Sequence, residues 1–195
     1  SSLSHDQRQR FDALRARLPA VPASLANSAA VFLGPDYHYD LVRPGSATYG
    51  INPTPGSPNP MLEVVRLKGR ILQVREIDRA ETVGYGATYR APRPRRIATV
   101  PVGYADGYLR SLGNRGMAMI AGIPVPVVGR VSMDLITVDV SDVPEAAARP
   151  GGWVDLIGNG IDIDEVGDRA GTIGYEILTA LGHRYHRVYS GGDAA

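Results

Sequence analysis

The stretch NPTPGSPNP, residues 52–60, places four prolines in nine positions. Proline fixes φ and lacks a backbone N–H, so this stretch can form neither a helix nor a central strand. We therefore predict a linker here, with a domain boundary near residue 59. The parts on either side, residues 1–59 and 60–195, differ in the pattern of their apolar residues.

The N-terminal part has the pattern of alternating helix and strand. Ser4 begins a capping box, and apolar residues then recur at helical spacing until Pro19. Residues 23–26 predict a short buried strand followed by a loop of small residues, and residues 41–50 predict a short strand that runs into a glycine-bearing turn. This alternation is typical of βα units in a parallel sheet. Two such units cannot close a barrel, so residues 1–58 indicate the end of a larger α/β domain.

The C-terminal part has the alternating pattern of strands. Residues 61–77 alternate as in a strand with one face in water. Further strands are predicted at residues 96–102, 117–120, 125–140 and 153–157. Helices are predicted at residues 164–170 and at 172–181, the second capped by Thr172. We expect a mainly-β domain with one or two helices.

The composition argues against several classes of function. With 44% apolar residues and a formal net charge of +1, the chain does not fit a disordered or nucleic-acid-binding protein. No apolar run approaches the roughly 20 residues that cross a bilayer, so we expect no membrane partner. The absence of cysteine suits a reducing, cytoplasmic compartment. His183 and His186 lie in a basic stretch, and we expect no metal site there.

Several local motifs could carry chemistry, although each also has an ordinary structural interpretation. The loops at residues 27–28 and 43–46 follow predicted strands, so they are either phosphate cradles or simple turns. Tyr85 and Tyr104 are flanked by glycines at strand ends. Each is either an acid/base group or a packing residue at a bulge. Met133 is by default a packing residue on a strand face that it shares with Val131 and Leu135.

Taken together, the ordered motifs resemble those of the alanine racemases. They are NS at 27–28, DLVRPG at 40–45, GYGATY at 84–89, VGYADGY at 102–108, VGRVSMD at 128–134 and GYEI at 174–177. The resemblance implies an α/β plus β fold: residues 1–59 hold the last βα units of a TIM-type barrel, and a mainly-β domain follows. It also implies a bacterial, cytoplasmic homodimer that uses pyridoxal 5′-phosphate to interconvert L- and D-alanine for peptidoglycan.

The resemblance assigns a cofactor-binding group. Ser28 and the backbone at Gly45 and Ser46 match residues that hold the cofactor phosphate, and Tyr175 matches a tyrosine that also reaches it. Arg43 matches the arginine that faces the pyridine nitrogen. A permanent cation there disfavours protonation of the ring nitrogen and should limit side reactions.

The resemblance also assigns catalytic and substrate-binding residues. Tyr85 matches the acid/base that handles the proton of L-alanine. The backbone N–H of Met133 matches the group that receives the substrate carboxylate, while Tyr104 and Asp134 match the inner gate of the substrate channel. In the family Tyr85, Tyr104 and Met133 serve the active site of the other subunit, so the dimer is part of the implied mechanism.

One departure concerns lysine. The family's second base is a lysine that also binds the cofactor covalently, but its motif is missing and Lys68 is the only lysine. Lys68 alternates with Arg66 and Arg70, where solvent would keep its amine protonated. We expect the chain to be the C-terminal part of an alanine racemase that is inactive without an N-terminal fragment as partner. Two alternatives are a non-catalytic β module for dimerisation or ligand binding, and a racemase of broader specificity.

Overall fold

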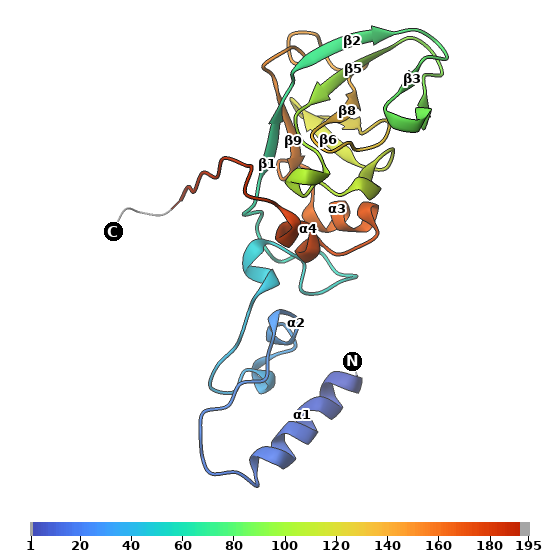
Figure 1. Ribbon diagram of the computed structural model, residues 1–195. Coiled ribbons are helices and arrows are strands. Elements are labelled where there is room, and N and C mark those ends of the chain that lie inside the picture. The colour runs from blue at the N-terminus through green and yellow to red at the C-terminus, as the bar shows by residue number, and fades with distance from the viewer. Residues whose placement is uncertain (1, 192–195) are drawn as a thin grey trace. The chain divides into compact units, whose positions relative to one another are not determined.

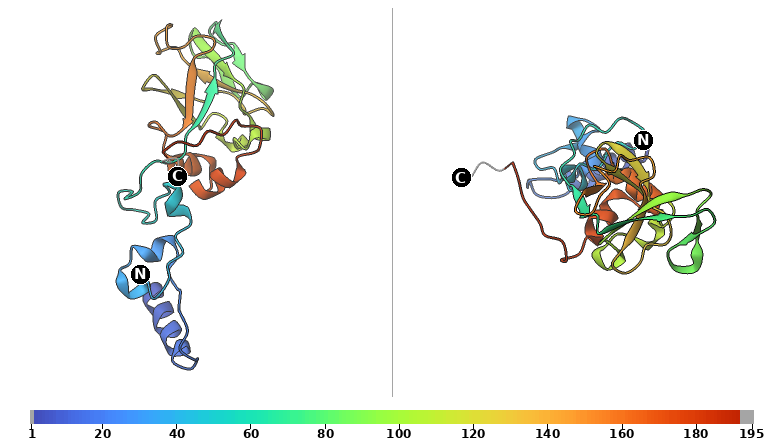
Figure 2. Two further views of the ribbon diagram at one scale, coloured as in Figure 1. Left: turned by 90° about the vertical axis from the view of Figure 1, so that its left-hand side faces the viewer. Right: turned by 90° about the horizontal axis from the view of Figure 1, so that it is seen from above.

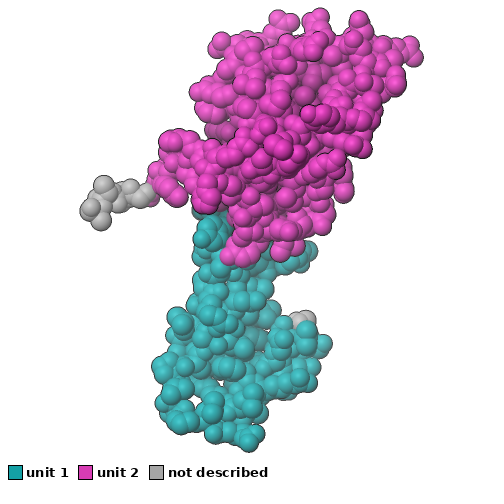
Figure 3. Space-filling view, viewed as in Figure 1, with its two compact units in different colours: residues 1–64 teal, residues 65–195 magenta. Residues whose placement is uncertain are grey.

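The computed structural model describes residues 2–191 and divides into two compact units (Figure 3). Unit 1 comprises the described residues up to Val64, and unit 2 comprises those from Val65 onward. The sequence placed the boundary near residue 59. The proline-rich residues 52–60 contain neither helix nor strand, as predicted, and they belong to unit 1.

Unit 1 consists of short helices joined by extended segments (Figure 1). Its helices are α1 (Ser2–Arg15), α2 (Ser28–Val31) and the 3-10 helices η1 (Pro35–Tyr37) and η2 (Ser46–Tyr49). The predicted capping box at Ser4 is wrong, because Ser4 lies within α1. Helix α1 buries none of its side chains. Its apolar spacing therefore does not face a core within unit 1.

The two strands predicted in unit 1 do not form. In residues 2–64, the segments of residues 23–27 and 40–43 meet at one isolated parallel bridge, between Asn27 and Arg43. The backbone N–H of Arg43 donates to the carbonyl of Ala26 at 2.9 Å. A strand needs a ladder of such bonds along its length. The two predicted strands are therefore extended segments joined at a single bridge, and the end of the second predicted run forms η2 instead.

Unit 2 is built mainly from strands, as the sequence predicted, and the strands pair in antiparallel fashion (Figure 1). A four-stranded sheet has the order β1-β9-β6-β7, a three-stranded sheet has the order β2-β5-β8, and β3 and β4 form a hairpin. The strands are β1 (Leu67–Arg70), β2 (Gln73–Ile77), β3 (Thr82–Val83), β4 (Tyr89–Arg90), β5 (Arg95–Val100), β6 (Met117–Ile120), β7 (Ile123–Pro126), β8 (Ile136–Asp139) and β9 (Trp153–Ile157). The core contains large, fully buried side chains that include Ile71, Leu112, Ile120, Ile136, Leu156 and Ile157.

Two long predicted strands are broken in the structure. The run at residues 61–77 becomes β1 and β2, which lie in different sheets. The run at 125–140 becomes β7 and β8, with a loop at residues 127–135 between them. Met133 was predicted to pack beside Val131, but its side chain is 54% exposed while Val131 is buried. A positive φ at Gly129 and a tight Ser132–Leu135 turn end the alternation.

Helices α3 (Ile163–Ala170) and α4 (Gly174–Ala180) lie together at one end of the sheets of unit 2 (Figures 1 and 2). Asp162 caps α3 by accepting from the backbone N–H of Asp164 at 2.7 Å. Thr172 was predicted to cap α4, but α4 begins at Gly174 and the Thr172 hydroxyl donates to Glu176 instead. In residues 2–191 we find no helix long and apolar enough to cross a membrane.

Unit 2 also contains short 3-10 helices. They are η3 (Tyr85–Ala87), η4 (Tyr104–Asp106) and η5 (Arg110–Leu112). Each lies in a connection between strands, where the chain is free to present side chains to solvent.

Candidate active site

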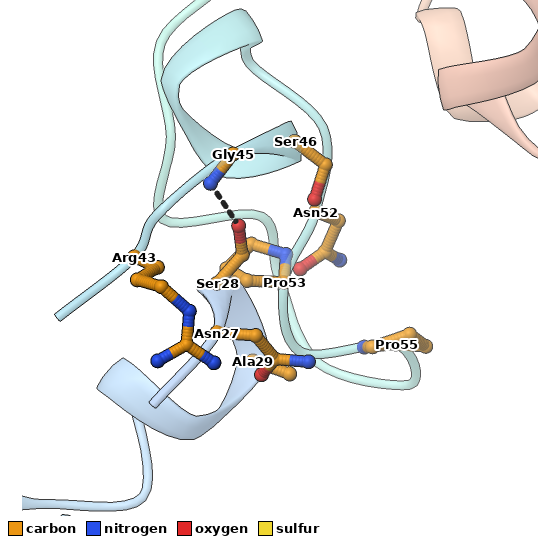
Figure 4. Close-up of a pocket in the computed structure, with 9 residues that line it drawn as sticks. All are labelled: Asn27, Ser28, Ala29, Arg43, Gly45, Ser46, Asn52, Pro53 and Pro55. Atoms are coloured by element: carbon orange, nitrogen blue, oxygen red, sulfur yellow. Dashed lines mark hydrogen bonds between the residues drawn. The ribbon is translucent and has the colours of Figure 1, made fainter. Parts of the chain in front are cut away.

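A hollow of about 380 Å³ lies in unit 1, where α2 and η2 both begin (Figure 4). Its lining includes Ser28, Arg43, Gly45 and Ser46, the four residues of unit 1 that the sequence assigned to the cofactor. The first N–H groups of a helix have no acceptor within that helix. Two helix starts beside one hollow therefore suit an anion such as a phosphate.

The Ser28 hydroxyl organises this hollow. It is buried and accepts hydrogen bonds from the backbone N–H of Gly45 at 2.9 Å and of Ala47 at 3.2 Å. Figure 4 shows the bond to Gly45. Asn27 caps α2 by accepting from the N–H of Ala30 at 3.0 Å, which fixes the start of the helix. The two loops are thus joined through one side chain.

Arg43 lies at the edge of the same hollow. Its side chain is exposed, and its guanidinium donates to the Ser24 hydroxyl and to the carbonyl of Leu25, the latter at 3.3 Å. Both partners are neutral. Among the residues that the structure describes, no carboxylate forms an ion pair with Arg43. Its charge is therefore open to an anionic or electron-rich ligand.

Tyr85 lies on the connection between β3 and β4. The β3–β4 hairpin stands out from the sheets (Figures 1 and 2). Tyr85 is 73% exposed. Within residues 2–191 its phenol forms no hydrogen bond. Glycines on both sides have positive φ angles, +75° at Gly84 and +71° at Gly86. The backbone therefore turns sharply on either side of Tyr85 and presents its ring outward.

Tyr104 and Met133 lie on two loops that touch. The N–H of Tyr104 donates to the Ser132 carbonyl and that of Ala105 to the Met133 carbonyl, both at 3.0 Å. A Cβ at Gly103 would lie 2.3 Å from the Met133 carbonyl oxygen, so only glycine permits this approach. The N–H of Met133 itself has no protein acceptor within residues 2–191. It is available to a carboxylate.

Asp134 is joined to the Tyr104 loop through an arginine. Arg184 pairs with Asp134 at 2.8 Å and with the buried Asp106 at 3.1 Å. The hydrogen bond that Arg184 donates to Asp134 and the charge of Asp106 raise the pKa of Arg184. No local pattern in the sequence points to Arg184 or Asp106. Arg184 lies in the basic stretch around His183 and His186, and its two partners are distant along the chain.

Tyr175 lies in the first turn of α4 and is partly exposed. The end of α4 packs on the Tyr104 loop: Gly182 donates to the Asp106 carbonyl at 2.9 Å. A Cβ at Gly107 would lie 1.9 Å from the Ala180 carbonyl oxygen. The residues after Tyr104 are therefore fixed against the helix that carries Tyr175.

Lys68 lies in β1, away from these loops. Its amine pairs at 3.5 Å with Asp155, a buried residue of β9. This ion pair links the two strands.

In residues 2–191 no group of three or more histidines, cysteines or acidic residues is arranged to hold a metal ion, and His183 and His186 are both exposed.

Comparison with known proteins identifies the family. The model described as alanine racemase, N-terminal domain, matches residues 1–53, and the one described as alanine racemase, C-terminal domain, matches residues 64–189. The chain belongs to the alanine racemase family. Among curated relatives, an alanine racemase of Rhodospirillum rubrum is 59% identical over 97% of this chain and 50% of its own length. A catabolic alanine racemase of Mesorhizobium japonicum is 51% identical, over 97% of this chain and 49% of its own length.

Solved alanine racemases have the same fold. The enzyme from Bartonella henselae, solved with covalently bound pyridoxal phosphate, matches with a TM-score of 0.92 and 42% identity. It covers 97% of this chain, which spans 53% of it. The biosynthetic enzyme from Pseudomonas aeruginosa matches with a TM-score of 0.90 and 40% identity, over 98% of this chain and 53% of its own. These likenesses support a barrel part followed by a C-terminal β domain.

The alanine racemase family therefore explains the order of the motifs, and the resemblance seen in the sequence is confirmed. The chain spans about half the length of the curated relatives it matches.

Proposed function

We propose that this chain contributes one part of an enzyme that interconverts L- and D-alanine with pyridoxal 5′-phosphate. The observation that carries the proposal is the hollow of unit 1: Ser28, Arg43, Gly45 and Ser46, assigned from the sequence, line it together. The bacterial relatives named alanine racemase support the same reaction. We also propose that the enzyme works in the bacterial cytoplasm, where it supplies D-alanine for peptidoglycan.

The residues of the hollow fit the cofactor's phosphate. Ser28 accepts from the amides of Gly45 and Ala47, so its hydroxyl sets the shape of this loop. Helix starts beside the hollow supply N–H donors and a favourable dipole for an anion. When bound, the cofactor withdraws electrons from the amino acid and so makes the proton on its Cα acidic. We propose that Tyr175 also reaches the phosphate.

Arg43 would set the electronic character of the site. A guanidinium is charged at every physiological pH, and a second positive charge beside it is unfavourable. Its neutral partners, Ser24 and Leu25, leave that charge uncompensated. Arg43 would therefore disfavour protonation of a ring nitrogen placed against it and restrict the chemistry to proton transfer.

Tyr85 would remove the Cα proton of L-alanine on one face of the substrate, or deliver a proton there in the reverse reaction, while the second base acts on the opposite face. Its exposed phenol can reach a group outside its own hairpin. The free N–H of Met133 would bind the substrate carboxylate, and Tyr104 and Asp134 would line the approach. We propose that Tyr85, Tyr104 and Met133 act in the active site of a second subunit of a homodimer.

The second base, a lysine that would also bind the cofactor covalently, would come from residues outside this sequence. Lys68 is held by Asp155 in a sheet of unit 2. We therefore expect residues 1–195 alone to form no stoichiometric covalent adduct with pyridoxal phosphate. Borohydride reduction followed by intact-mass measurement tests this. A single phosphopyridoxyl group on every chain would contradict it, as would racemisation of alanine by the isolated chain.

The activity is tested in a chimera in which this chain replaces the matching segment of the Rhodospirillum rubrum relative. We expect the chimera to racemise alanine and Tyr85→Phe to lower kcat by about 10²–10⁴, the usual contribution of an acid/base group. Tyr189→Phe, which changes a highly exposed tyrosine, is the matched control. Faster turnover of other amino acids would indicate a broader racemase, and a folded chimera without any turnover would favour a binding module.

A further inference from the structure

We propose that Asn114 is a positioning residue for Tyr85: it ties the loop that carries the phenol to the loop at Gly129. This inference rests on the proposed function, because Asn114 would affect catalysis only by positioning Tyr85. It concerns a residue that the sequence analysis did not single out. Asn114 lies between η5 and β6, 29 positions after Tyr85 in the sequence.

Tyr85 is not held by contacts of its own side chain. The ring is largely exposed, and within residues 2–191 the phenol has no hydrogen-bond partner. Only two residues of each strand pair in the hairpin beneath it, with Val83 opposite Tyr89. A two-stranded hairpin of this length is not stable alone in water. The direction of the Tyr85 ring therefore depends on what holds the backbone around it.

The two strand residues that flank the Tyr85 loop, Val83 and Tyr89, are held by packing. Val83 is buried in a small cluster with Ile97 and Val128, against which Tyr89 packs. A Cβ at Gly129 would lie 2.8 Å from the Val83 carbonyl oxygen, so the two backbones touch where only glycine fits. Gly129 also has a φ of +77°. The backbone before Tyr85 is thus fixed against the loop at residues 127–135.

The second half of the Tyr85 loop is held by the Asn114 side chain. The amide nitrogen of Asn114 donates to the Thr88 hydroxyl at 3.2 Å and lies 3.4 Å from the Thr88 carbonyl oxygen. Its amide oxygen accepts from the N–H of Gly129 at 2.6 Å. The side-chain amide of Asn114 therefore links Thr88, at the end of the loop, to Gly129, which contacts Val83 at its beginning.

The backbone at Asn114 fits this role. Its N–H donates to the Gly129 carbonyl at 3.1 Å, so backbone and side chain together bind both polar groups of Gly129. The φ of Asn114 is +58°, a conformation that asparagine tolerates better than other residues with a Cβ. Gly113 approaches the same loop, since a Cβ there would lie 3.0 Å from the Gly129 carbonyl oxygen. Three chain segments meet at this point.

Three variants separate the side-chain link from the backbone conformation. Asn114→Gly keeps the positive φ and removes the link. Asn114→Asp keeps an acceptor for Gly129 but loses the donor to Thr88. Thr88→Val removes the hydroxyl from the other end. The matched control is Asn159→Gly, which removes another asparagine of positive φ, +53°, whose amide donates to Asp155.

The first measurement is amide hydrogen exchange of the 195-residue chain, read on a peptide that covers residues 82–91. We expect all three variants to speed its exchange by about tenfold, the effect of losing one or two hydrogen bonds, while β5 stays protected. Asn159→Gly should leave this peptide unchanged. Unchanged exchange in Asn114→Gly would overturn the proposal. So would wild-type exchange in Asn114→Asp, because the Thr88 contact would then be dispensable.

The second measurement is kinetic and uses the Rhodospirillum rubrum chimera. Asn114→Gly should lower kcat about tenfold with KM changed less than twofold, and it should have no further effect in a Tyr85→Phe background. An equal loss in both backgrounds would overturn the proposal, because the residue would then act through stability alone. An inactive parent chimera would instead count against the proposed function, and the exchange measurement would still decide whether Asn114 holds the hairpin.

Discussion

The two units differ in what holds them together. Unit 2 encloses a core of large apolar side chains between two antiparallel sheets and two helices. In unit 1 the buried apolar residues are mainly small, such as Ala26 and Ala47, and α1 has no buried side chain. Apolar burial is the main source of folding free energy. Unit 2 therefore has its own source of stability, whereas unit 1 has little.

Polar contacts hold α1 in place of a core. Arg8 pairs with Asp36 at 2.6 Å, and the Tyr39 hydroxyl donates to Asp12 at 2.6 Å. Phe11 contributes an edge contact with the Tyr39 ring at 5.0 Å. Exposed ion pairs of this kind stabilise a structure only weakly and are screened by salt. The contrast shows that the hydrogen-bonded loops around the hollow lie in a region that lacks a core of its own.

The largest expected effect comes from separating the units. We expect residues 65–191 alone to unfold in one cooperative transition, because their core is complete. Residues 2–64 alone should show no cooperative transition. Circular dichroism during urea titration measures both. A sharp transition in the N-terminal piece would remove the contrast between the units.

Truncation of single leucines should show the same contrast at smaller scale. Leu156 is 0% exposed in unit 2, so Leu156→Ala should lower the free energy of unfolding by about 2–5 kcal/mol. Leu14 in α1 is 59% exposed, and Leu14→Ala should change it by less than about 0.5 kcal/mol. Urea denaturation of the full chain gives both values. Equal losses would show that α1 is packed after all.

The third prediction concerns Tyr108, whose hydroxyl is buried in the core of unit 2. It is 2% exposed, and its hydroxyl has no hydrogen-bond partner among the residues that the structure describes. We expect Tyr108→Phe to leave stability unchanged or raise it by up to about 1 kcal/mol, because an unpaired buried hydroxyl is removed. A large loss would reveal a bonding partner for this hydroxyl.

The pH dependence gives a second test of Tyr108. Burial raises its pKa, so the folded state keeps the phenolic proton where the unfolded state loses it. Stability should therefore fall as the pH rises above the ordinary tyrosine pKa of about 10. Tyr108→Phe should show a shallower fall. Denaturation at a series of alkaline pH values distinguishes the two proteins.

The smallest effect concerns Tyr39 in unit 1. Burial and the hydrogen bond to Asp12 raise the pKa of Tyr39 from 10.0 to about 12. The stability that this phenol contributes is present below pH 10 and is lost as the pH rises through about 12. A difference titration between wild type and Tyr39→Phe, by ultraviolet absorbance, should show one phenol titrating near pH 12. Titration near pH 10 would show that Tyr39 is not held by Asp12.

The sequence by itself determined those features that depend on neighbouring residues. Strands β6 and β9 match the predicted runs at 117–120 and 153–157, and the helix predicted at 164–170 forms as α3, which Asp162 caps. Strand alternation and helix capping are local properties, so a local pattern suffices to predict them. The ordered motifs also identified the family, and they selected four residues that line one hollow.

Only the tertiary structure decided where the long apolar runs break and which polar groups meet. The run at 61–77 divides between two sheets, because each half pairs with a different strand. Met133 turns outward because the loop around it folds onto Gly103. The links made by Arg184 and Asn114 join residues that are distant along the chain. Such contacts are fixed by the packing of the whole unit, and no local spacing encodes them.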